Sequence, residues 1–196
     1  TEIYTLSLHD ALPIYAENYP PLSELGVEEM QNLTKYLKAR GVKNDAIYTS
    51  PSIRTVQSAM MVAKLFKKEY EIIDELKTRD CGSWNGLTFG QIMDKCPEGL
   101  DRILKYPEEK TMAGAEGSVE FIARIKKVID SLVAKNIGNR IIIVTHPEVI
   151  QAAICGALDI PADKLPKIFI RTGSATQISY YENWASLVYS DRKSVV

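Results

Sequence analysis

An unbroken run of β-branched residues, Ile-Ile-Ile-Val within Arg140–Thr145, constrains the fold of this chain more than any other feature. A strand with one face in water alternates apolar and polar residues, whereas this run is apolar at every position. It therefore predicts a strand that is buried on both faces. Strands of that kind belong to mainly parallel sheets covered by helices on each side, which predicts an α/β protein.

The patterns around this strand alternate between helix and strand. Ser23 is expected to cap a helix that Gly41 stops, and Pro51 fits the first turn of a second helix that ends near Phe66. Two further helices are predicted over residues 118–135 and 149–158. Further strands are predicted over residues 46–49, 71–73, 168–170, 175–181 and 185–189.

Residues 74–117 differ from the rest because they hold many glycines and prolines. They predict a loop-rich insertion with one or two short helices, placed as the lid or side wall of a pocket. No interdomain linker or internal repeat is visible. We expect one domain, a three-layer sandwich with a mainly parallel sheet flanked by helices.

Composition excludes several classes of protein. The chain has 196 residues with 24 Lys and Arg against 25 Asp and Glu, which argues against a uniformly basic nucleic-acid binder. No run of about 18 apolar residues could span a membrane. The three cysteines show no C-x-x-C spacing, so we expect reduced thiols in the cytoplasm. The presence of only two histidines excludes a multi-histidine metal centre.

The two ends of the chain have unusual sequences. Residues 1–14 resemble a sequencing-library adapter translated in frame, and residues 191–196 resemble the start of the opposite-strand adapter. We expect both segments to be non-native, which leaves residues 15–190 as the domain and His146 as its only histidine. The alternatives for residues 1–14 are a true first strand or a signal peptide. A signal peptide fits badly, because the segment has no basic start and no long apolar stretch.

Two predicted strand ends carry polar residues that could form a site. In open α/β sheets, ligands bind at the carboxyl ends of the strands. Arg54 falls in the first turn of the helix that follows residues 46–49, where helix amides and a guanidinium can bind an anion. His146 directly follows residues 140–145. Taken singly, a solvated arginine and a structural histidine are the alternative interpretations. Together they predict a phosphate or carboxylate pocket that contains an imidazole, without a reaction type.

The same segments, taken together, resemble the histidine phosphatase superfamily, the phosphoglycerate-mutase-like group. Residues 50–59, Ser-Pro-Ser-Ile-Arg-Thr-Val-Gln-Ser-Ala, resemble its Ser-Pro-x-x-Arg segment, and Thr145-His146 matches its second catalytic histidine. Residues 82–86 resemble its Gly-x-Trp-x-Gly element. Further matches in the family's order are residues 21–26, 114–124 and 172–174, so the resemblance covers nearly all of residues 15–190.

The resemblance implies a phosphomonoester hydrolase that needs no metal or other cofactor and acts on a small phosphorylated substrate. In that family a first histidine, in an Arg-His-Gly motif, attacks phosphorus, and water hydrolyses the resulting phosphohistidine. Arg54 would bind phosphate, and His146 would stabilise the charge on the transferring phosphoryl group. A carboxylic acid protonates the leaving alkoxide. Asp80 and Glu148 are the main candidates, and Glu75 and Glu116 are further substitutes, because Thr78 stands where the family often has Glu.

The nucleophile motif is the largest departure from the family. Arg-His-Gly should lie just before Tyr15, where the adapter-like sequence stands. Leu8-His9-Asp10 imitates the motif in a strand-like context, but Leu8 supplies no guanidinium. We therefore do not assign the nucleophile to His9, and we expect the chain as written to have lost phosphatase activity.

Three alternatives stay open. One is mutase-type phosphotransfer, as in phosphoglycerate mutases, and another is a non-catalytic module that binds a phospho-ligand. A nucleotide-binding α/β domain ranks lower, because no Gly-x-Gly-x-x-Gly or Walker-type loop follows a predicted strand. The sequence predicts neither the substrate nor the oligomeric state.

Overall fold

The computed structural model describes residues 1–7, 21–87, 91, 94–95, 97–98 and 114–191. Within these residues it contains a six-stranded sheet in the order β3-β2-β4-β1-β5-β6. Strands β1 to β4 run parallel to one another, whereas β5 pairs antiparallel with β1 and with β6. The strands are β1 (Glu2–Ser7), β2 (Ala46–Thr49), β3 (Tyr70–Ile72), β4 (Arg140–Thr145), β5 (Ala175–Tyr180) and β6 (Ala185–Asp191).

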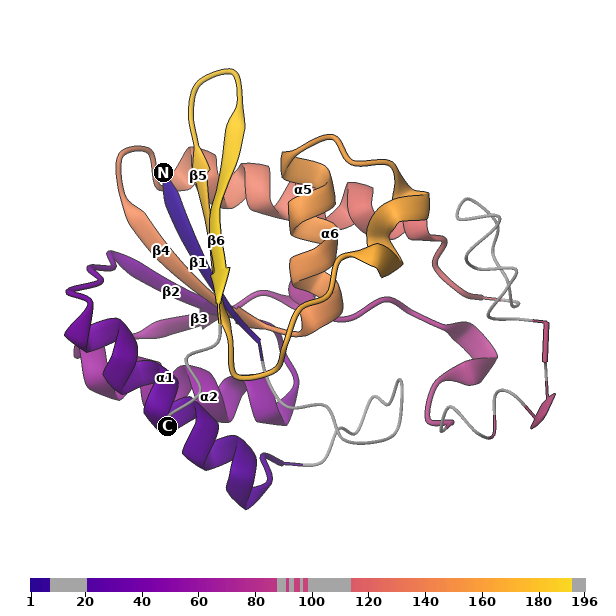
Figure 1. Cartoon of the computed structure of the whole chain (residues 1–196), viewed down its shortest axis with the longest axis horizontal. Coiled ribbons are helices and arrows are strands. Elements are labelled where there is room, and N and C mark those ends of the chain that lie inside the picture. Colours follow the sequence, from indigo (N-terminus) through magenta and orange to yellow (C-terminus); the bar gives the residue numbers. More distant parts are fainter. Residues whose placement is uncertain (8–20, 88–90, 92–93, 96, 99–113, 192–196) are drawn as a thin grey trace.

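Two pairs of helices cover the two faces of this sheet (Figure 1). Helices α1 (Glu24–Ala39) and α2 (Ile53–Phe66) lie on one face, and α5 (Ser118–Lys135) and α6 (Pro147–Ala157) lie on the other. Short 3-10 turns are η1 (Asp74–Leu76), η2 (Gly82–Trp84) and η3 (Ala162–Lys167). The predicted three-layer α/β sandwich with a mainly parallel sheet is confirmed.

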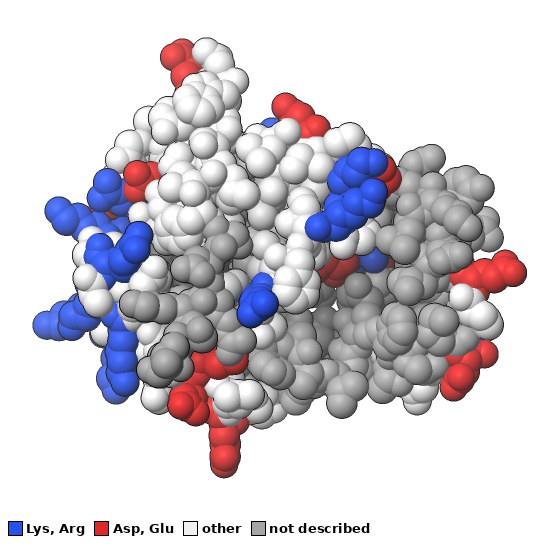
Figure 2. Space-filling model, in the orientation of Figure 1, with Lys and Arg blue, Asp and Glu red and all other residues white. Residues whose placement is uncertain are grey.

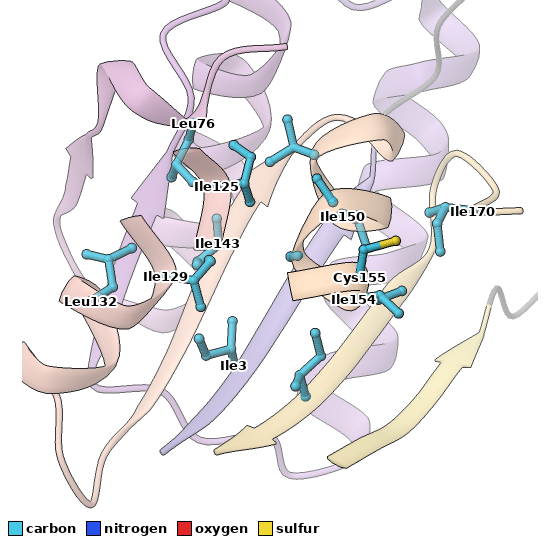
Figure 3. Close-up of a cluster of buried hydrophobic side chains, with 14 of the residues drawn as sticks. Ile3, Leu76, Ile125, Ile129, Leu132, Ile143, Ile150, Ile154, Cys155 and Ile170 are labelled. Carbon is cyan, nitrogen blue, oxygen red and sulfur yellow. The ribbon is translucent and has the colours of Figure 1, made fainter. Parts of the chain in front are cut away.

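The apolar run in β4 explains why both faces are covered. Ile141 and Ile143 belong to the hydrophobic cluster under α5 and α6 (Figure 3), and Ile142 and Val144 belong to the cluster under α1 and α2. All four side chains are 0% exposed. Neighbouring residues of a strand point to opposite faces, so a strand apolar at every position buries side chains in both clusters.

Helix boundaries follow the expected caps. The Ser23 hydroxyl accepts a hydrogen bond from the Gly26 amide at 3.1 Å at the start of α1. Gly41, with φ of +66°, follows the end of that helix, because a left-handed turn favours glycine. Helix α6 begins at Pro147, two residues earlier than predicted. Proline suits the first helical position, where its missing N–H would have no intrahelical partner.

The predicted strand at residues 168–170 is wrong. These residues follow η3 and pair with no strand within the described sheet. Ile170 is buried, but Phe169 is 80% exposed, so this apolar segment only partly covers the core. A run of three apolar residues cannot distinguish such a segment from a strand.

The N-terminal segment forms the centre of the sheet. Strand β1 lies between β4 and β5, and its register pairs Ser7 with Thr145. Ile3 and Leu6 are fully buried, one in each hydrophobic cluster. Glu2–Ser7 is therefore a strand of the described sheet, in keeping with the alternative of a true first strand. The adapter origin of that sequence, and of residues 191–196, stays a prediction.

Nearly half of the predicted insertion at residues 74–117 lies outside the described residues. Its described part includes η1 and η2, with Leu76 and Trp84 buried against the body of the domain. The predicted lid role stays a prediction. None of the described helices is both long and apolar enough to cross a membrane.

Charged side chains form no single basic face in the view of Figure 2. Lys and Arg gather along the left edge of that view, and Asp and Glu lie at several separate points around the rim. The visible described surface thus carries charge of both signs, in keeping with the near balance of the composition.

Candidate functional site

The carboxyl ends of β2 and β4 are joined directly. The Ser50 amide donates to the Val144 carbonyl at 3.2 Å, and the Thr49 hydroxyl donates to the same carbonyl at 3.1 Å. Helix α2 starts just after β2, and helix α6 starts just after β4. The first turns of the two helices, which carry Arg54 and His146, therefore meet at one edge of the sheet.

Arg54 and His146 are in contact, as the sequence predicted for a common site. Arg54 Nη2 lies 3.4 Å from His146 Nδ1. The two residues are only 4% and 1% exposed. Ser52 Oγ lies 3.1 Å from the other ring nitrogen, Nε2. The result is a buried imidazole held between a guanidinium and a hydroxyl at the carboxyl edge of the sheet.

The imidazole of His146 is neutral at physiological pH. Burial lowers its pKa from 6.5 to about 3, and the positive charge of Arg54 acts in the same direction. A negatively charged ligand beside the ring would oppose the effect of Arg54 and favour protonation. The site is therefore neutral at the ring and cationic at the guanidinium, an arrangement suited to an anion.

Glu148, one of the two predicted proton donors, is engaged by an arginine. Its carboxylate lies 3.2 Å from Arg79 Nε, and the two side chains are 17% and 11% exposed. Arg79 also donates from Nη1 to the Ser118 hydroxyl at 2.9 Å. Arg79 thereby ties the first turn of α6 to the first turn of α5, close in sequence to His146.

Asp80, the other predicted donor, is held in a local turn. Its carboxylate accepts hydrogen bonds from the Gly82 amide and the Asn85 side chain, both at 2.8 Å. These hydrogen bonds lower the pKa of Asp80 below its usual value, and the bond from the Gly82 backbone N–H contributes most. Among the contacts of the described residues, none joins the Asp80 carboxylate to His146 or Arg54.

Another arginine, Arg124, contacts several residues of the segment between β3 and α5. Arg124 binds both oxygens of the Glu116 carboxylate, at 2.7 and 2.8 Å. Its remaining N–H groups donate to the backbone carbonyls of Glu75, Lys77 and Thr78. We call this set, Arg124 with Glu116 and the three carbonyls, the Arg124 clamp. The Arg124 clamp holds the residues around Thr78 against α5. Within it, the Glu116 carboxylate is bound to Arg124.

The turn at Thr172-Gly173-Ser174 precedes β5, which runs antiparallel to β1, so this turn lies at the same edge of the sheet as His146. Gly173 has φ of +63°, and a Cβ there would lie 3.0 Å from Glu29 Oε2. The positive φ favours glycine at this position, and the close approach of the Glu29 side chain disfavours a larger residue further.

His9 lies outside the described residues. Strand β1 ends at Ser7 in register with Thr145, so the chain leaves the sheet at the edge that carries His146. Whether His9 contributes to the site stays a prediction. Within the described part of the chain, no three or more His, Cys, Asp or Glu side chains are grouped as a metal site would require.

The sequence matches a known family over most of its length. The family model described as the histidine phosphatase superfamily (branch 1) matches residues 11–191. The chain belongs to the histidine phosphatase superfamily. The family resemblance predicted from the separate motifs is confirmed.

Relatives in this superfamily include phosphatases with named substrates. Phosphoserine phosphatase 1 of Hydrogenobacter thermophilus is 27% identical over 147 residues, which cover 74% of this chain and 68% of that protein. The metal-independent phosphoserine phosphatase of Arabidopsis thaliana is 28% identical over 133 residues, or 67% of this chain. The chain spans only 56% of that plant protein's length. These names support phosphatase activity of the superfamily type.

A solved structure shows the same fold. Bacillus stearothermophilus YhfR superposes with a TM-score of 0.87 at 23% identity, covering 95% of each chain. At that level of identity the likeness establishes the histidine phosphatase fold alone. It agrees with the six-stranded sheet and its two layers of helices.

Ser52 is the site residue that sequence reasoning missed. It occupies a variable position between Ser50 and Arg54 in the matched segment, so the motif gives it no role. The only available signal was a hydroxyl two residues before the arginine, at the start of a helix. That signal normally indicates a helix cap, and only the tertiary structure places Ser52 beside His146.

Proposed function

We propose that this domain is a phosphomonoester hydrolase that binds a small phosphorylated substrate at the carboxyl edge of its sheet. The contact between Arg54 and the buried, neutral His146 is the observation that carries the proposal. A guanidinium offers paired N–H donors to phosphate oxygens, and the adjacent imidazole supplies a group that gains a proton as negative charge arrives. The phosphatase names among the relatives support this assignment.

In the proposed reaction, a histidine nitrogen attacks phosphorus while the bond from phosphorus to the leaving alkoxide oxygen breaks. Arg54 and His146 stabilise the negative charge on the oxygens of the phosphoryl group during this transfer. The alkoxide takes a proton from a carboxylic acid. Water then attacks phosphorus, the phosphorus–nitrogen bond breaks, and inorganic phosphate and the free histidine form.

Of the two proposed proton donors, Glu148 is favoured by its position. It lies in the first turn of the helix that begins directly after His146. Asp80 is disfavoured because its carboxylate is bound in a local turn by the Gly82 amide and the Asn85 side chain, and no contact among the described residues joins it to His146 or Arg54. In any variant that shows turnover, Glu148→Gln tests whether Glu148 is the proton donor.

Phosphate binding tests the anion site without requiring turnover. We expect Arg54→Ala to weaken binding of inorganic phosphate by about 10- to 100-fold, the value of a hydrogen-bonded charge. Titration calorimetry on the whole chain measures it. Arg40→Ala is the matched control, because Arg40 is exposed at the end of α1 and lies over the Tyr36 ring. Equal phosphate affinity in Arg54→Ala and the unaltered chain would refute the proposal.

We propose that turnover in the chain as written is limited by the sequence around His9. The double variant Leu8→Arg/Asp10→Gly recreates Arg-His-Gly around that histidine. If His9 can serve as the nucleophile, this variant gains hydrolysis of phosphoserine and forms an acid-labile phosphohistidine. The same double variant with His9→Gln is the control and should show neither.

The outcome of that experiment also separates the alternatives. A phosphohistidine that persists and passes its phosphoryl group to a second acceptor would favour mutase-type transfer. Phosphate binding that depends on Arg54, with no hydrolysis even when the motif is present, would favour a non-catalytic phospho-ligand module.

A further inference from the structure

Ser52 occupies a helix cap position without acting as a cap. It is the N-cap residue of α2, with φ of −67° and ψ of 146°, yet its side chain makes no capping hydrogen bond. Ser23 at the same position of α1 does cap its helix, by accepting from the Gly26 amide. A serine cap is typically worth about 1 kcal/mol to a helix. Ser52 forgoes that stabilisation and directs its hydroxyl elsewhere.

The hydroxyl of Ser52 is directed at the site histidine. Ser52 Oγ lies 3.1 Å from His146 Nε2 and 2.8 Å from Thr55 Oγ1. Thr55 in turn donates to the Ser50 carbonyl at 2.9 Å. The imidazole is therefore connected through two hydroxyl groups to the backbone at the end of β2.

The contact with Arg54 indicates where the proton of the ring lies. A guanidinium has only donors, so at the 3.4 Å contact with Arg54 the ring nitrogen Nδ1 must accept. The neutral ring then carries its hydrogen on Nε2. Nε2–H donates to Ser52 Oγ, Ser52 donates to Thr55, and Thr55 donates to the carbonyl of Ser50 or of Ser52, both next to the end of β2. Every donor in this sequence meets an acceptor.

We propose that Ser52 is a positioning residue for His146, which holds the Nε2–H tautomer and the ring orientation through the hydroxyl pathway to the end of β2. The meaning of this role for catalysis rests on the proposed function. Its geometry does not, because it concerns the ligand-free protein. The assignment also excludes Ser52 as a nucleophile activated by His146, since a nitrogen that carries hydrogen cannot accept the serine proton.

Nitrogen NMR on the whole chain, labelled with ¹⁵N in its histidine rings, tests the tautomer directly. The chain has only two histidines, and His9→Gln identifies the signals of His146. At neutral pH and without ligand, we expect Nδ1 of His146 in the range of an unprotonated nitrogen. Nε2 should show a slowly exchanging, hydrogen-bonded proton. A His146 ring protonated on Nδ1 would overturn the proposal without any variant at position 52.

Variants at position 52 test the serine itself. Ser52→Ala should lose the downfield shift and the slow exchange of the Nε2 proton, and Ser52→Thr should retain both. Ser58→Ala is the matched control, because Ser58 is buried in the same helix but donates to the Arg54 carbonyl. An unchanged Nε2 proton signal in Ser52→Ala would refute the positioning role.

The two experiments separate the failure of this inference from the failure of the proposed function. If the phosphate affinity is insensitive to Arg54→Ala while the Nε2 proton depends on Ser52, the anion site is refuted and the positioning role stands. If phosphate binding depends on Arg54 but the ring signals ignore Ser52, the positioning role alone is refuted.

Discussion

Two arginines at the carboxyl edge of the sheet differ in what surrounds them. Arg124 binds both oxygens of Glu116 and three backbone carbonyls, so its charge is compensated and its N–H groups are used within the fold. Arg54 is more deeply buried and contacts a neutral imidazole, whose pKa its charge helps to lower. A fixed geometry around a neutral neighbour suits a ligand site, whereas a carboxylate-bound arginine suits a structural clamp.

The comparison teaches that residue type and location do not decide the role of an arginine. Both side chains come from helices that flank the sheet, α2 on one face and α5 on the other, and both fall within residues 11–191, which match the family. Arg124 is bound to the Glu116 carboxylate, which supports a stabilising role, whereas the contact with His146 supports the proposed anion-binding role of Arg54.

Replacement of Arg124 is expected to have the largest effect on the free energy of unfolding, and it tests the contrast between the two arginines. Arg124→Ala should lower the free energy of unfolding by about 2 to 3 kcal/mol, because Glu116 and three carbonyls lose their donor in a partly buried setting. Urea unfolding measures the change, and the phosphate affinity should stay within about twofold. Lys126→Ala on the same helix is the control. It breaks only an exposed pair with Asp130 and should cost about 0.5 kcal/mol.

A loss of phosphate affinity in Arg124→Ala as large as in Arg54→Ala, in a folded protein, would break the comparison. It would show that Arg124 contributes to the anion site directly. A change in unfolding free energy no larger than that of Lys126→Ala would show that the clamp does not stabilise the fold.

Acid should destabilise the fold through His146, the residue that Arg54 contacts. The unfolded chain protonates His146 near pH 6.5, whereas the folded chain does so near pH 3, so stability falls as pH drops between these values. From pH 7 to pH 5 the loss through this residue is about 2 kcal/mol. Unfolding of the unaltered chain and of His146→Gln at both pH values measures it. Equal pH dependence in the two proteins would contradict the buried, neutral ring.

Arg79 shares features with both arginines. Its replacement should have the smallest effect on the free energy of unfolding. It pairs with Glu148 and donates to Ser118, and thus links the starts of α6 and α5. Arg79→Met keeps most of its volume and removes the charge, and should lower the unfolding free energy by about 1 to 2 kcal/mol. Thermal denaturation measures it, with Arg79→Lys as the control that keeps the charge. An unchanged midpoint in Arg79→Met would show that the pair adds nothing.

Much of the fold was predictable because it follows from local patterns. The run in β4, the periodicity of α5 and the cap at Ser23 each reflect a requirement that neighbouring residues already express. Residues 168–170 were misassigned because a short apolar segment covers the core equally well as a strand or as a loop. A strand in residues 1–14 was only one alternative from the sequence, and its pairing with β4 and β5 at the centre of the sheet depends on distant segments.

The sequence by itself determined the α/β class, the superfamily and the pairing of Arg54 with His146. The class rests on burial patterns, and the pairing rests on the rule that parallel strands present their carboxyl ends at one edge. The superfamily rests on the resemblance of the motifs. Only the tertiary structure decided which carboxylates are engaged by Arg79 and Arg124, and that Ser52 binds the imidazole rather than its own helix. Such choices depend on which side chains from distant segments meet in a buried setting, and spacing along the chain does not encode those distances.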